Sequence, residues 1–191
     1  LLNHPTEKNA SGFLTIKKTL KNDNLFELTV NQHLQLKEEN HFYSAHILKA
    51  NILCKTDSLA TPIQWEMISW YKHNQSNTEI LRLHETAVFK NNQIERETRN
   101  GVFHTAIQGR FSLEWCLIEA IQRNQIEIKF PFTVLEKFIR IKSNQQIKKI
   151  TDNHTLQNQF RFLTRYVRKY NGVNYQEYWL NKQNRLISFN D

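Results

Sequence analysis

The chain has 191 residues, of which 39% are hydrophobic and 23% are charged; this balance is typical of a globular protein and excludes a wholly disordered one. Only four glycines and three prolines are present, which leaves little room for glycine-rich phosphate loops or proline-rich linkers. The formal net charge of +8 favours anionic partners, and no apolar run approaches the roughly 20 residues that a membrane-spanning helix needs.

The first residues of the chain are polar and follow no pattern. We therefore expect a flexible segment at residues 1–11, ahead of a single domain at residues 12–191. The chain begins with two leucines and no methionine. Removal of a signal peptide would give such a start, and so would recombinant trimming. We prefer the first explanation and expect a periplasmic or extracellular protein.

Alternation of apolar and polar side chains predicts strands through the first half of the chain. It is clearest between Phe26 and Lys37, where apolar residues occupy every second position and only Gln32 breaks the set. Turns at Asn91-Asn92 and Asn100-Gly101 are expected to join neighbouring strands into hairpins. Further strands are expected at residues 13–20, 42–54, 63–71, 80–89, 93–98 and 102–108.

The apolar pattern changes between residues 111 and 121 from alternation to the repeat of a helix. Ser112 is expected to cap the N-terminus of this helix. The helix should bury Leu113, Cys116, Leu117, Ala120 and Ile121.

After the helix, alternation of apolar and polar side chains returns and predicts further strands. A turn is expected between them at 143–146, and Pro131 marks an edge strand or a bulge. The later strands are expected at residues 126–132, 135–142 and 147–150.

Asn171-Gly172 separates two alternating runs and predicts a two-residue hairpin turn near the end of the chain. In the register of such a turn, Arg168 lies opposite Tyr175 and Tyr166 lies opposite Glu177. One face of this hairpin is then aromatic and the other basic. The rest of the chain must cover the aromatic face, while water covers the basic one.

About ten strands in hairpin order and one late apolar helix suit an antiparallel meander wrapped around that helix. The order of these elements and the closing hairpin NGVNYQEYWLNKQNRLI resemble the half-open-barrel superfamily, which includes the periplasmic lipoprotein carriers and many uncharacterised exported bacterial proteins. The resemblance implies a mostly β (α+β) fold, an antiparallel meander sheet curved as a half-open barrel around one buried amphipathic helix. It also implies an exported protein with space for a hydrophobic ligand.

The sequence carries no recognisable catalytic motif. GxSxG, HExxH, GxGxxG and the P-loop are all missing, and the eight histidines are scattered. We therefore expect no enzyme activity, no cofactor and no metal site. Cys54 and Cys116 form no CxxC pair and have no histidine at zinc-site spacing, so they are either two buried free thiols or one disulfide.

The closing hairpin supplies the predicted ligand-binding residues. Arg168 and Glu177 would both project from the aromatic face, one diagonal step apart, and could form an ion pair at the edge of the core. A buried ion pair is costly and therefore marks a candidate site; the alternative is that this end of the hairpin is simply exposed. Tyr166 and Tyr175 adjoin the pair, and Trp179 belongs to the same face.

A basic strip lies between residues 137 and 170, which hold nine lysines and arginines against one aspartate. The excess in this stretch equals the whole net charge of +8. A field of one sign attracts phosphate groups, whereas a solvated face without a partner is the alternative. The members of the basic strip that we expect on the surface are Lys148, Lys149, Arg161, Arg165 and Lys169.

These observations favour a non-catalytic exported protein that binds an apolar or amphiphilic ligand or a partner in the cell envelope. The alternative is a nucleic-acid or polyanion-binding module that uses the basic strip, for which an anionic lipid surface would also serve as partner. Aromatic side chains at strand spacing fill ordinary cores as well as ligand cavities. The two functions therefore depend on where the hairpin residues lie in the fold.

Overall fold

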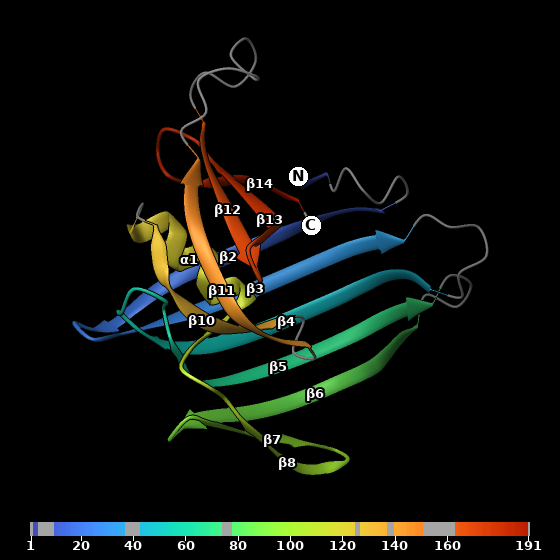
Figure 1. Ribbon diagram of the computed structural model, residues 1–191. Coiled ribbons are helices and arrows are strands. Elements are labelled where there is room, and N and C mark those ends of the chain that lie inside the picture. The colour runs from blue at the N-terminus through green and yellow to red at the C-terminus, as the bar shows by residue number, and fades with distance from the viewer. Residues whose placement is uncertain are drawn as a thin grey trace.

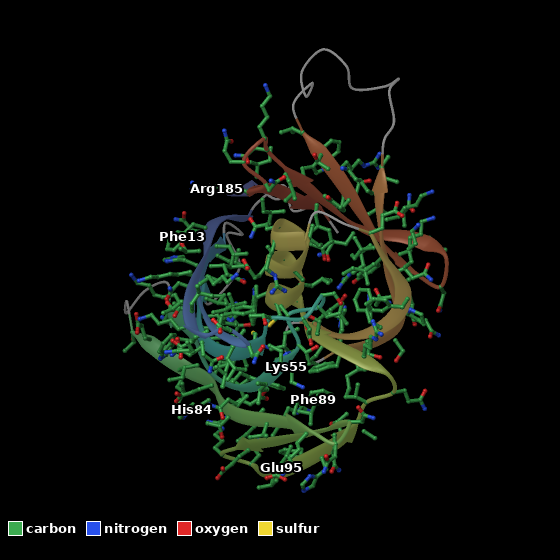
Figure 2. The ribbon with its side chains drawn as sticks, turned by 90° about the vertical axis from the view of Figure 1, so that its left-hand side faces the viewer. Phe13, Lys55, His84, Phe89, Glu95 and Arg185 are labelled. Atoms are coloured by element: carbon green, nitrogen blue, oxygen red, sulfur yellow. The ribbon has the colours of Figure 1, made fainter. Side chains whose placement is uncertain are left out.

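Two β-sheets face each other with one helix between them. The structure is a computed structural model that describes residues 2–3, 10–36, 43–73, 78–124, 127–136, 140–150 and 163–190. Figure 1 shows the arrangement of the elements, and Figure 2 shows the helix between the two sheets. We call the sheet faces that point toward the helix the inner faces. The predicted mostly β (α+β) fold with antiparallel pairing and one helix is confirmed, but the strands form two sheets where a single meander was expected.

The first sheet is a meander of eight strands in sequence order, and each pair of neighbours is antiparallel. Alternation places Phe26, Leu28 and Val30 in the core, while Glu27 and Thr29 between them stay partly exposed on the outer face. The strands are β1 (Leu2–Asn3), β2 (Ala10–Asn22), β3 (Leu25–Leu36), β4 (Tyr43–Lys55), β5 (Pro62–His73), β6 (Glu79–Lys90), β7 (Gln93–Thr98) and β8 (Gly101–Ala106).

The second sheet has six strands in the order β14-β13-β12-β11-β10-β9. β9 and β10 are parallel because the helix crosses over between them, whereas the other pairs are antiparallel. The strands are β9 (Arg110–Leu113), β10 (Ile128–Glu136), β11 (Arg140–Ile150), β12 (Thr164–Tyr170), β13 (Val173–Leu180) and β14 (Leu186–Asn190). Four-residue β9 was not predicted, because it is too short to show a period.

Helix α1 (Glu114–Asn124) joins the two sheets into one core. Its residues from Trp115 to Ile121 are all buried, so the predicted helix is confirmed and is covered on every side. Polar contacts tie it to both sheets: Lys18 Nζ of β2 lies 2.9 Å from Glu119 Oε1, and the Leu186 N–H of β14 donates to Gln122 Oε1 at 2.7 Å.

The predicted hairpin turns at Asn91-Asn92 and Asn171-Gly172 are confirmed, whereas the turn predicted at Asn100-Gly101 lies one residue earlier, because Gly101 already pairs with Thr98 in β8. Asn91 and Asn92 have φ values of 53° and 56°, and Asn171 and Gly172 have φ values of 49° and 80°. Positive φ at both central residues is the requirement of the type I′ turn, which asparagine and glycine tolerate better than other residues. These short signals therefore determine where β6–β7 and β12–β13 reverse.

The predicted turn at 143–146 is wrong, because β11 continues through it from Arg140 to Ile150. Asn144 has a φ of 56°, and the pairing of β10 with β11 shifts between Phe132–Gln145 and Val134–Lys142. The polar residues therefore form a β-bulge inside a strand. Pro131 lies in the other irregularity of β10, between Ile128 and Phe132, as its sequence position predicted.

Two predictions for the ends of elements are also wrong. Ser112 is the third residue of β9, and its Oγ donates to the Leu59 carbonyl at 2.8 Å, so it does not cap α1. Leu2–Asn3 form β1 and pair with residues 11–12 of β2. At those residues strand pairing replaces the expected flexible segment, whereas residues 4–9 lie outside the described part of the chain.

Shortening a buried side chain of α1 tests the shared core. Leu117 is 0% exposed between the two sheets, so we expect Leu117→Ala to lower the free energy of unfolding by about 2–5 kcal/mol. Urea denaturation measures the change. Leu20→Ala is the control, because Leu20 is 69% exposed and its loss should change stability by less than about 0.5 kcal/mol. Equal losses in the two variants would contradict the described packing.

Candidate functional site

Four side chains form a buried charged group on the inner face of the second sheet, which we call the Arg168 cluster: Glu136, Lys142, Arg168 and Tyr175. Arg168 is 0% and Glu136 5% exposed. Arg168 Nη2 donates to Glu136 Oε1. The other carboxylate oxygen, Oε2, lies 3.5 Å from Lys142 Nζ and accepts from Tyr175 Oη at 3.3 Å. The single carboxylate of Glu136 therefore forms ion pairs with two cations.

Strand register brings the Arg168 cluster together. Ile147 of β11 pairs with Arg168, and Arg168 pairs in turn with Gln176 of β13. The next pair is Lys169 with Asn174, so Tyr175 is an extra residue that forms a β-bulge. The bulge allows Tyr175 to reach the same cluster as Arg168, although Gln176 is the residue opposite Arg168.

Aromatic rings cover the outer end of the cluster. Lys142 Nζ lies 3.3 Å from the ring centroid of Tyr175 and 5.5 Å from that of Tyr170. The guanidinium carbon of Arg168 lies 4.9 Å from the Tyr175 centroid. Such contacts stabilise cations over aromatic faces. Tyr170 is 37% exposed, so the cluster extends from the core to the surface at this end of the hairpin.

Polar neighbours connect the cluster to the start of α1. Tyr178 Oη donates to Gln176 Oε1 at 2.6 Å, and Gln176 Nε2 donates to Glu114 Oε1 at 3.5 Å. Burial acts to lower the pKa of Arg168, but Tyr178 and the carboxylates of Glu136 and Glu114 outweigh it and raise the pKa above its ordinary value. The buried guanidinium therefore stays charged.

Arg168 keeps hydrogen-bonding capacity that the described part of the chain does not use. Among the residues that the structure describes, its buried Nε and Nη1 atoms have no hydrogen-bond partner, and neither has Oε1 of Gln145 on the neighbouring strand. A guanidinium offers five N–H donors in a fixed plane, and leaving buried donors unpaired is costly. In chemistry, these donors match the oxygen acceptors of a carboxylate or phosphate.

The predicted pair of Arg168 with Glu177 is wrong. Glu177 lies on the outer face, where Arg165 donates to both of its carboxylate oxygens. Trp179 is also outside, with the Arg165 guanidinium 5.4 Å from its ring centroid. The reason is the bulge at Tyr175, because one extra residue turns every following side chain of β13 to the opposite face.

The structure brings together two of the five predicted ligand-binding residues, Arg168 and Tyr175. Tyr166 lies in the same inner face at 1% exposure and pairs with Tyr178, and burial raises its pKa. Glu136 and Lys142 were not predicted as ligand-binding residues, and Lys142 counted only as one of the nine bases of the strip. The sequence signal for Glu136 is its position at the end of a largely apolar run, at 132–135, just before those bases.

The basic strip is divided between the two faces of the second sheet. Lys148 pairs with Val167 and Lys149 with Tyr166, so these adjacent lysines point to opposite faces, although both are exposed. Lys148, Arg165 and Lys169 share the outer face, where Glu177 neutralises Arg165. Arg161 lies outside the described residues.

The two cysteines are buried free thiols, as one of the two alternatives predicted. Their Sγ atoms lie 3.5 Å apart, Cys54 on β4 and Cys116 on α1. Burial, together with the neighbouring Cys54 thiol, raises the pKa of Cys116 well above its ordinary value. This pair therefore belongs to the contact between the helix and the first sheet.

The described part of the chain contains neither a cluster of metal-ligating side chains nor a membrane-spanning helix. No group of three or more His, Cys, Asp and Glu side chains is placed to hold a metal ion within that part of the chain. No helix described there has the length and apolarity needed to cross a membrane.

Comparison with known proteins supports the fold. No family model and no curated protein matches the chain. Among solved structures, the chain is similar to the crystal structure of a β-barrel-like protein of a domain of unknown function, DUF1849, from Brucella abortus. The match covers 95% of this chain and 88% of that one, with a TM-score of 0.50 and 8% sequence identity. This likeness supports a β-barrel-like fold and does not define a function.

A double-mutant cycle tests the ion pair of Arg168 with Glu136. Removing one partner of a buried pair leaves the other charge uncompensated, so Arg168→Met should cost about 3–5 kcal/mol of stability. Glu136→Gln in the same chain should recover part of that loss. The half-buried pair of Arg165 with Glu177 should show a coupling of only about 0–1 kcal/mol. A strong coupling between Arg168 and Glu177 in urea denaturation would contradict the described register.

Proposed function

We propose that this chain is a non-catalytic binding protein for an amphiphile with an anionic headgroup. In this proposal the headgroup is bound by Arg168, beside Lys142, and the apolar part lies between the inner faces of the two sheets. The observation that carries the proposal is the fully buried Arg168, whose Nε and Nη1 atoms have no hydrogen-bond partner among the described residues. A carboxylate or phosphate is the group that pairs best with such a planar set of donors.

The charge balance of the cluster supports an anionic ligand. Glu136 is shared between Arg168 and Lys142, so the four-residue cluster holds one more positive than negative charge. Glu114 offsets this excess from a greater distance, through its effect on Arg168. An anionic headgroup would neutralise the remaining charge where water is largely excluded, and there its attraction to the cations is stronger than in bulk water.

We propose binding without catalysis because the reactive groups of the cluster are held in contacts with each other. Glu136 accepts from Arg168 and Tyr175 and lies beside Lys142, which makes it a poor general base. The sheets would form the walls of a half-open barrel similar to that of the periplasmic lipoprotein carriers. A periplasmic or extracellular protein that receives a lipid-like ligand or contacts a partner in the cell envelope suits this arrangement.

Fatty-acid binding provides the direct test. We expect the wild-type chain to bind a fluorescent long-chain fatty acid about tenfold or more tightly than the alcohol of equal length, since hydrogen bonds to a charged group contribute about 1.5–3 kcal/mol. Arg168→Met should abolish that preference, and native mass spectrometry of gently purified protein should show a retained anionic amphiphile.

Arg185→Met is the matched control, because Arg185 is exposed in the turn before β14. The double variant Arg168→Met/Glu136→Gln keeps the test valid if the single variant is unstable. Equal affinity of the wild type for acid and alcohol, or an unchanged preference in the double variant, would refute the role of Arg168.

Polyanion binding is the second candidate function. The exposed Lys148 and the half-buried Lys169 share the outer face of the second sheet with Arg165. The arrangement of that face supports polyanion binding less strongly than the run of bases in the sequence did, because Arg165 is paired with Glu177 and Lys149 lies on the other face. The remaining positive charge would attract phosphate groups of nucleic acid or anionic lipid.

Charge reversal distinguishes this function from a general effect of net charge. If the outer face binds polyanions, Lys148→Glu/Lys169→Glu should lose retention on heparin at about 0.15 M salt, where the screening length is about 8 Å. Its melting temperature should change little, because exposed charges contribute little to folding. Lys55→Glu/Lys90→Glu carries the same charge change on the exposed surface of the first sheet. Equal loss in both variants would assign retention to bulk charge.

A further inference from the structure

β8 is an open edge of the first sheet. It is the last strand of the eight and lies at the lower margin of the molecule in Figure 1; among the described strands it pairs with β7 alone. Val102 is 54% and Phe103 46% exposed, on opposite faces of the strand. An edge strand presents a row of backbone groups that another strand can pair with.

The register identifies the backbone groups that face outward. Thr98 and Gly101 close the hairpin, and the Ile107 N–H donates to the Asn92 carbonyl at 2.8 Å, one residue beyond the Gln93–Ala106 pair. Hydrogen-bonded and non-hydrogen-bonded pairs alternate in antiparallel strands. The N–H and C=O groups of Val102, His104 and Ala106 therefore point away from β7, toward the open edge.

Nothing in β8 protects this edge. Proteins commonly protect edge strands with lysine, proline or a bulge. The sequence GVFHTA contains neither lysine nor proline, and its pairing with β7 runs without a register shift. With six residues β8 has the length of an average strand, so the edge can accept a strand of similar length.

The outer face beside the edge is acidic. A hollow of about 350 Å³ crosses the outer face from β3 to β7, and its lining includes Glu27, Glu66, Glu95 and Glu97 but no lysine or arginine. Glu95 and Glu97 stand on β7 directly behind β8, opposite His104 and Val102. Figure 2 places Glu95 at the end of the molecule remote from Arg185. Lys21 Nζ lies 3.3 Å from Glu27 Oε2 on β3, so the acidic end of the hollow is the one beside β8, at Glu95 and Glu97.

We propose that the β8 edge binds an extended, basic segment of a partner protein by adding it as a further strand of the first sheet. Main-chain hydrogen bonds to Val102, His104 and Ala106 would provide affinity, as in other cases of strand addition. Alternate side chains of the segment would meet Phe103 on the inner face. The remaining side chains, lysine or arginine, would extend over the small Val102 toward Glu97, about 10 Å away across two strand spacings.

A basic segment suits this surface better than a second copy of β8. Two copies paired through β8 would add no positive charge beside Glu95 and Glu97, because the strand contains neither lysine nor arginine. Pairing of six residues alone also gives an interface well below the roughly 1,200 Å² of a stable dimer. Charge complementarity therefore selects the partner, and dimer formation becomes an outcome of the test.

A synthetic peptide tests the proposal on the intact chain. The probe is a labelled seven-residue peptide in which lysine alternates with valine or phenylalanine, and fluorescence anisotropy measures its binding. We expect the lysine peptide to bind the wild-type chain with an affinity that falls as the salt concentration rises. The same peptide with glutamate in place of lysine should bind at least about tenfold more weakly. Amide NMR shifts should change first at Val102, His104 and Ala106.

Two variants separate the backbone contribution from the charge contribution. His104→Pro removes an outward N–H while leaving the hydrogen bonds to β7 intact, which an edge strand tolerates. Because it also removes the imidazole whose Nδ1 lies 3.7 Å from Glu95 Oε2, it is compared with His104→Ala, relative to which it should reduce affinity about tenfold or more. Glu95→Gln/Glu97→Gln should reduce affinity similarly and flatten the salt dependence. Glu79→Gln/Asp23→Asn removes two exposed acids outside the hollow and should bind as wild type.

Three results would overturn the proposal. These are equal binding of the lysine and glutamate peptides, unchanged affinity in Glu95→Gln/Glu97→Gln, and a concentration-dependent dimer in sedimentation with no peptide binding. The last result would assign the edge to a second copy of the chain. If His104→Pro fails to fold, the charge variant and the two peptides decide the outcome alone.

Discussion

The fold depends on burying helix α1 on every side. A helix with one apolar stripe can lie on a single sheet, but Trp115, Leu117 and Ile118 point in different directions and are all buried. Two sheets must therefore cover the helix, and the chain supplies the first before α1 and most of the second after it. The crossover through α1 also explains why β9 and β10 run parallel in an otherwise antiparallel protein.

A single extra residue, Tyr175, decides which side chains of the closing hairpin meet. Without the bulge, Glu177 and Trp179 would face the core, and Gln176 and Tyr178 would face solvent. With it, Gln176 and Tyr178 are buried, while Glu177 pairs with Arg165 outside. Arg168 then pairs with Glu136, which is 32 positions away in the chain. The inner polar cluster is thus a product of local irregularity combined with long-range strand pairing.

Two regions of the molecule differ in the sign of their charge. The excess of bases between residues 137 and 170 lies mainly on β11 and β12 of the second sheet, partly buried as Arg168 and Lys142. The outer face of the first sheet carries glutamates across β3, β5 and β7. A net charge of +8 therefore describes neither surface. Anionic groups are attracted to one region and cationic groups to another, so the two proposed binding events need not compete.

The sequence by itself determined the elements that depend on local chemistry. Alternation predicted the long strands, the helical repeat predicted α1, and Asn171-Gly172 predicted a turn with positive φ. Tertiary structure alone decided the bulges at Asn144 and Tyr175, because a bulge depends on what the partner strand offers and hardly changes the local pattern. It also decided the partner of Arg168, since β10 and β12 are brought together only when the whole second sheet assembles around the helix.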